Sequence, residues 1–60
     1  MSKVSAEAFC VLQDLIDNNQ CIRIEKYGEC IEITVFPDLL SGEHSHYQGH
    51  TLIEVLSKFK

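Results

Sequence analysis

The sequence predicts an α+β fold: an N-terminal helix, an antiparallel β-hairpin with room for a short third strand, and a C-terminal helix. Two observations predict it. Apolar residues recur at helical period in the first sixteen positions, and two alternating segments rich in β-branched residues, CIRIE and CIEITVF, flank a turn that contains Gly28. Because a helix and a half-buried sheet must cover each other's apolar faces, both helices are expected on one face of the sheet.

The chain of 60 residues is expected to form a single domain, residues 1–60. Its composition, 45% hydrophobic and 23% charged, is typical of a folded domain rather than a disordered one. A domain of this size buries only about 60% of the surface that its unfolded chain exposes, so self-association is a common supplement. Five basic residues against nine acidic ones give a net charge of −4. This balance disfavours direct nucleic-acid binding, which needs a basic stripe for phosphates, and suits a basic protein partner.

The three cysteines, Cys10, Cys21 and Cys30, are an odd number, whereas a disulfide framework needs an even set. The sequence has no leader-like opening and no apolar run of membrane-spanning length. We therefore expect free thiols, a cytoplasmic location and no membrane contact. Cys10 is expected to be a small core residue of the first helix.

The first helix is predicted from one apolar stripe. The stripe consists of Val4, Ala8, Val11, Leu12, Leu15 and Ile16. Asn18 and Asn19 are a plausible stop, since Asn tolerates the left-handed conformation in which helices often end.

In the hairpin, a four-residue loop would place Glu25 opposite Cys30. The isoleucines of both strands then share one face, and Arg23 lies opposite Glu32 on the other. Pro37 ends the second strand, because it has no amide to donate.

Residues 38–50 are long for a structureless loop, so a short third strand is expected over residues 44–48. Thr51 and Glu54 then match a capping box that opens a short helix. The buried stripe of that helix is predicted to be Leu52, Val55, Leu56 and Phe59.

A sheet of two or three strands leaves open edges and an outer face, which proteins usually cover. We therefore expect a homodimer, formed by edge-strand pairing or by packing of the outer faces. The candidate interface residues are Cys21, Arg23, Thr34 and Phe36.

His44, His46 and His50 form an H-x-H-x3-H pattern, and imidazoles are good ligands for zinc, nickel or copper. The spacing matches no standard structural zinc site, so no metal and no other cofactor is predicted. The sequence also lacks a carboxylate pair in a predicted pocket and a cysteine with a nearby base. An enzyme is therefore not expected.

One stretch resembles the small domain of HicB-type antitoxins, in which a strand ends in Phe-Pro-Asp-Leu and a later Gly-x-Thr-Leu-x-Glu opens a helix. The matching positions are Phe36, Pro37, Asp38, Leu39, Gly49, Thr51, Leu52, Glu54 and Leu56. The match runs from the hairpin to the C-terminus. His50 stands where the family has an acidic residue, and Leu40-Ser41 where it has Pro-Gly. The resemblance implies a three-stranded sheet, dimerisation, and a role in binding and blocking a protein.

The sequence therefore favours a small acidic, homodimeric module that sequesters or inhibits a basic protein partner, as an antitoxin-like or phage- or prophage-encoded inhibitor would. The expected partner-binding residues are Asp38, Glu43, His44, His46 and Tyr47. Two alternatives remain open: a ligand- or metal-binding module that uses the His44–His50 loop, and a structural subunit of a larger assembly.

Overall fold

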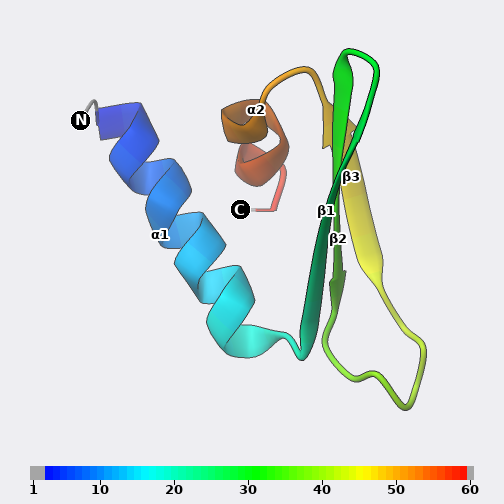
Figure 1. Ribbon diagram of the computed structural model, residues 1–60. Helices are drawn as coiled ribbons and strands as arrows, with labels where there is room; N and C mark the ends of the chain where they lie inside the picture. Colours follow the sequence, from blue (N-terminus) through cyan, green and yellow to red (C-terminus); the bar gives the residue numbers. More distant parts are fainter. Residues whose placement is uncertain (1–2, 60) are drawn as a thin grey trace.

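The computed structural model describes residues 3–59, and their side chains from Ala6 onward, so the predicted role of the Val4 side chain lies outside the described part. The elements are α1 (Lys3–Asn18), β1 (Cys21–Tyr27), β2 (Cys30–Phe36), β3 (Ser45–Gly49) and α2 (Leu52–Ser57). Both helices lie on one side of the sheet (Figure 1). The predicted α+β fold is confirmed, including the third strand.

The sheet is an antiparallel meander with the strand order β1-β2-β3. β2 is therefore the central strand, and β1 and β3 are the two edges. α2 contacts β2 and β3, whereas α1 contacts α2 and β1.

The hairpin is tighter than the sequence analysis predicted. Tyr27 lies opposite Cys30, so only Gly28 and Glu29 form the turn, and the predicted Glu25–Cys30 pairing is wrong. Gly28 has φ of 61° and Glu29 does not have a positive φ, which fits a type II′ turn. Such two-residue turns match the right-handed twist of the strands, which explains why the shorter loop is preferred.

The register differs from the predicted one by two residues. Since side chains alternate with period two, every residue stays on its predicted face while its partner changes. Ile24 lies opposite Ile33, and Arg23 lies opposite Thr34 rather than Glu32.

The core forms between the inner face of β2 and α2. Ile33 and Val55 are fully buried, and Leu56 and Val35 are 2% and 4% exposed. Among the α1 side chains that the structure describes, Ala8 is the buried one. Partly buried apolar side chains surround this core: Val11, Leu12, Leu15, Ile22, Ile31 and Phe59.

The close approach of α2 to β3 depends on Gly49. A Cβ atom at this position would lie 3.0 Å from Cγ2 of Val55 and 3.1 Å from Cδ of Glu54. Those distances are tighter than ordinary van der Waals contact, so the missing side chain lets α2 settle on the sheet.

Three apolar predictions are corrected by the structure. Cys10 is exposed rather than buried, because it follows the core residue Ala8 by two positions, or about 200° around the helix. Ile16 is 53% exposed at the margin of the α1 stripe. Leu52 is 40% exposed, since the short α2 turns only Val55 and Leu56 fully into the core.

Side chains cap both helices. At the end of α1, the amides of Asn18 and Asn19 donate to the carbonyls of Asp14 and Leu15, both at 2.8 Å. Among the described residues only glycines have positive φ, so these bonds rather than a left-handed residue end the helix. At the start of α2, Oγ1 of Thr51 accepts from the N–H of Glu54 at 3.1 Å.

The Glu54 carboxylate completes the α2 cap from the other direction. It accepts the N–H of His50 at 2.9 Å, one residue earlier than a standard capping box. This bond to the His50 N–H lowers the pKa of Glu54 below its ordinary value of 4.5.

Replacing Ile33 tests whether β2 holds the core. Ile33→Ala is expected to lower the free energy of unfolding by about 2–5 kcal/mol, and Ile33→Val by about 0.5–1.5 kcal/mol, through lost burial and a residual cavity. Leu40, between β2 and β3, is 97% exposed, so Leu40→Ala serves as the control with a smaller loss. Urea unfolding followed by circular dichroism measures all three, and equal losses at the two positions would contradict this core.

Replacing Thr51 tests the α2 cap. Thr51→Ala is expected to lower the free energy of unfolding by about 1 kcal/mol, because the first-turn amide of Glu54 loses its acceptor. Thr51→Ser keeps an oxygen at this position and should retain most of the stability. The readout is the urea midpoint at neutral pH; a Thr51→Ala protein as stable as the parent would show that the cap contributes nothing.

The lowered pKa of Glu54 sets a pH dependence. Its contribution to stability is complete above the ordinary carboxyl value of 4.5 and is lost as the pH falls through the lower folded-state value. Glu54→Gln should therefore remove this part of the acid-induced loss. Urea midpoints of both proteins between neutral and strongly acidic pH measure it, and identical pH profiles would refute the assignment.

Candidate functional site

The sheet has a face that neither helix covers, here called the outer face (Figure 1). Ile33 and Val35 of β2 point into the core, so the residues that alternate with them point the other way. With the cross-strand partners, the outer face consists of Cys21, Arg23, Glu25, Tyr27, Cys30, Glu32, Thr34, Phe36, His46 and Gln48.

Two carboxylates lie directly opposite each other in the middle of the outer face. Glu25 of β1 is the cross-strand partner of Glu32 of β2, and Gln48 of β3 continues the same row. Like charges directly opposite are destabilising, so this row is an unfavourable arrangement for the isolated sheet.

Each carboxylate of this pair has its own polar partners. An oxygen of Glu32 accepts the side-chain amide of Gln48 at 2.8 Å and lies 4.0 Å from Nδ1 of His46. The Glu32 side chain is only 17% exposed. Glu25 pairs with the Arg23 guanidinium at 3.1 Å and accepts the phenolic O–H of Tyr27. This bond, together with the negative charge of Glu25, raises the pKa of Tyr27 above its ordinary value of 10.0.

Two further rows lead from the acidic row to the end of the sheet where β2 ends. Thr34 lies between Arg23 and His46 and is 8% exposed, although it points away from the helices. Beyond it, the rings of Phe36 and His44 have centroids 5.4 Å apart, and those of His44 and His46 lie 5.8 Å apart. The polar row of Arg23, Thr34 and His46 therefore lies between the acidic row and an aromatic row that contains Phe36 and His44.

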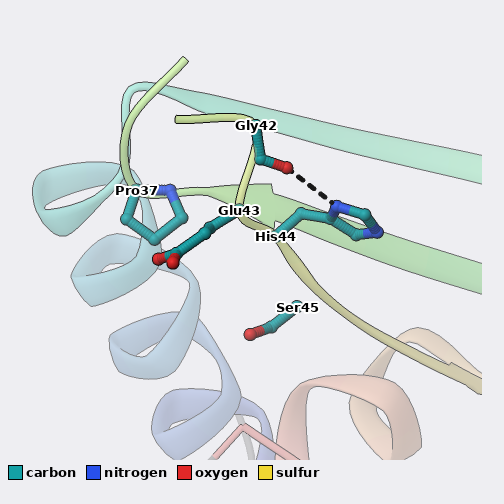
Figure 2. Close-up of a pocket in the computed structure, with 5 residues that line it drawn as sticks. All are labelled: Pro37, Gly42, Glu43, His44 and Ser45. Carbon is teal, nitrogen blue, oxygen red and sulfur yellow. Dashed lines mark hydrogen bonds between the residues drawn. The ribbon is translucent and has the colours of Figure 1, made fainter. Parts of the chain in front are cut away.

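The connection from β2 to β3 forms an open hollow of about 450 Å³ beside this aromatic row. Its lining residues are Pro37, Gly42, Glu43, His44 and Ser45 (Figure 2). Nδ1 of His44 lies 3.3 Å from the carbonyl oxygen of Gly42, so the ring is held toward the loop backbone (Figure 2). The hollow extends the surface available for contact at this end of the sheet.

The structure separates the residues predicted to bind a partner. His44 and His46 lie together at one end of the sheet, and Glu43 lines the hollow with His44. Asp38 builds the loop instead: its carboxylate accepts the N–H of Leu40 at 2.9 Å. Tyr47 points to the helix side, where its ring packs against Phe59 with centroids 4.7 Å apart. The alternation of β3 is the signal that separates Tyr47 from His46.

The predicted interface residues Cys21, Arg23, Thr34 and Phe36 do share the outer face. The row of Glu25, Glu32 and Gln48 is not predicted from the sequence. Their alternation with core residues is visible in the sequence, but the opposition of the two carboxylates depends on the hairpin register.

The predicted histidine cluster is divided. His44 and His46 flank the start of β3, whereas His50 follows its end and uses its N–H to bind Glu54. Six extended residues span about 20 Å, so these histidines do not converge. Within residues 3–59, no group of three or more His, Cys, Asp or Glu side chains is arranged to hold a metal ion.

The cysteines Cys10, Cys21 and Cys30 are free thiols. In the part of the chain that the structure describes, no helix has the length and apolar character needed to cross a membrane. Comparison with protein-family models, with curated proteins and with solved structures gave no match to this chain.

The opposed carboxylates give a prediction about stability. Glu32→Gln keeps an oxygen that can accept from Gln48 and removes the repulsion with Glu25, so it should raise the free energy of unfolding by about 0.2–1 kcal/mol. Glu25→Gln loses the ion pair with Arg23 and should gain less. Urea unfolding at low and high salt measures both. The gain should shrink with salt, and destabilisation by Glu32→Gln at low salt would contradict the repulsion.

Proposed function

We propose that this chain is a homodimeric protein-binding module that sequesters or inhibits a partner protein through the outer face of its sheet. The observation that carries the proposal is the opposed pair Glu25 and Glu32 at the centre of this uncovered face. Charges held at some expense of stability are a common sign of a surface kept for binding.

The chemistry of the face suits a partner with a basic surface. A lysine or arginine placed over the row would interact with both carboxylates and relieve their repulsion. The net charge of −4 steers a basic partner toward the molecule as a whole. Phe36 and the two histidines beside the row offer aromatic contact area, which protein interfaces favour.

The resemblance to HicB-type antitoxins supports the inhibitory form of this function. Its matching positions include Pro37, which follows the last residue of β2, and Thr51 and Glu54, which cap α2. These residues stabilise the fold rather than contact a partner. The resemblance therefore supports a similar sheet in this chain and in the HicB-type antitoxins more strongly than it supports a similar partner. The proposed module works in the cytoplasm, without a cofactor and without catalysis.

Affinity capture from the lysate of the source cell tests the proposal. The wild-type protein should retain a basic protein in stoichiometric amount, and Glu32→Lys should lose it, because the charge at the centre of the row is reversed. Asp14→Lys makes the same change of charge on the exposed side of α1 and should retain the partner. Mass spectrometry identifies the captured protein, and calorimetry at two salt concentrations measures its affinity. Retention of no protein, or equal retention by Glu32→Lys, would overturn the proposal.

A further inference from the structure

The two edge strands of the sheet, β1 and β3, differ in how readily another strand could pair with them. On β3, the Lys58 ammonium donates to the main-chain carbonyl of Gln48, and a charged side chain at an edge blocks strand addition. On β1, Ile24 is 53% exposed although it belongs to the helix-facing side, where its partner Ile33 is fully buried. β1, with seven residues, is also longer than β3, with five. The open edge is therefore β1.

The hairpin turn determines which backbone groups this edge presents. Residues that flank a two-residue turn exchange hydrogen bonds, so Tyr27 and every second residue before it direct their N–H and C=O groups toward β2. Ile22, Ile24 and Lys26 consequently direct theirs away from the sheet. An added strand would bond to these three residues.

The sequence of this edge is complementary to itself in antiparallel orientation. When Ile24 lies opposite Ile24 of a second copy, Arg23 lies opposite Glu25, and the same pair occurs again across the symmetry axis. In this register Ile22 also meets Lys26, so all three outward-directed residues find backbone partners. Moving the axis by one residue places Arg23 opposite Arg23 or Glu25 opposite Glu25, which is repulsive.

We infer that two copies of this chain pair through β1 in antiparallel orientation about an axis at Ile24, forming a continuous six-stranded sheet with reciprocal Arg23–Glu25 contacts. This inference rests on the homodimer of the proposed function and specifies the surface that forms it. Arg23 and Glu25 pair with each other within one chain at 3.1 Å, but their side chains are 59% and 31% exposed, so each can also approach the second copy.

The surroundings of the seam agree with this pairing. α1 is the helix that contacts β1, so both copies of α1 lie near the seam on the same side of the joined sheet. α1 carries the exposed apolar side chains of Phe9 and Ile16, at 63% and 53%, which the second copy can cover. The outer faces stay uncovered and join into one larger surface.

The experiment is analytical ultracentrifugation of the purified protein across the micromolar range. The wild-type chain should sediment with twice the mass of one chain. Ile24→Lys places two like charges against each other at the axis and should raise the dissociation constant about 100-fold or more. Ser45→Lys, at the β3 edge, is the matched control and should leave the dimer intact.

Charge exchange tests the register itself. Arg23→Glu and Glu25→Arg should each weaken the dimer, since each creates two like-charged contacts across the seam. The double variant Arg23→Glu/Glu25→Arg should restore the dimer, because the opposite charges meet again. Circular dichroism confirms that each variant is folded.

The outcomes separate this inference from the proposed function. A wild-type monomer throughout the concentration range would overturn both this pairing and the homodimer. A dimer that survives Ile24→Lys, or single charge variants that the double variant fails to rescue, would overturn the β1 seam alone. If a dimer formed through a different surface still captured a partner, the proposed binding function would remain supported.

Discussion

The packing of α2 against the central strand is the interaction on which the rest of this small domain depends. Among the side chains that the structure describes, Ile33 of β2 and Val55 and Leu56 of α2 are the most deeply buried. A helix of six residues has little stability of its own, so burial and its cap must hold it. Because β2 alternates, the strand that supplies the core also presents Glu32 and Thr34 on the opposite side. The alternation of β2 therefore determines both which of its residues form the core and which lie on the outer face.

The position of α2 explains why the two edges of the sheet differ. α2 covers β2 and β3, and from its C-terminal end Lys58 reaches the carbonyl of Gln48 on the β3 edge. α1 reaches β1 more sparingly, and Ile24 is left half-exposed beside a fully buried Ile33. A chain of 60 residues has too little secondary structure to cover three strands evenly. The uncovered part of the inner face therefore falls at β1.

The predictable features were those that local chemistry determines. The apolar period of α1, the alternation of the strands and the Thr51 cap all appear in the structure, because each depends on residues close together in the sequence. The hairpin register was not predictable from alternation, since a shift of two residues preserves both faces. Gly28 determines the register, because its positive φ allows the shorter two-residue turn. The sequence therefore indicated that Arg23 and Thr34 share a face, but it could not place the carboxylates of Glu25 and Glu32 opposite each other.

Arg23 and Glu25 belong both to the outer face and to the proposed seam, which links the two proposed interactions. In one chain, Arg23 already neutralises Glu25 at 3.1 Å. In the paired sheet, a second Arg23 would approach each Glu25 from the other copy, and the repulsion that Glu25 exerts on Glu32 would weaken. A basic partner would then gain less from relieving this repulsion, although the joined surface would offer it two acidic rows. Since linkage is reciprocal, a partner that engages Glu25 directly would loosen the seam, and one that engages Glu32 alone would loosen it less. The row that makes the face suitable for binding thus also determines whether binding and pairing oppose each other.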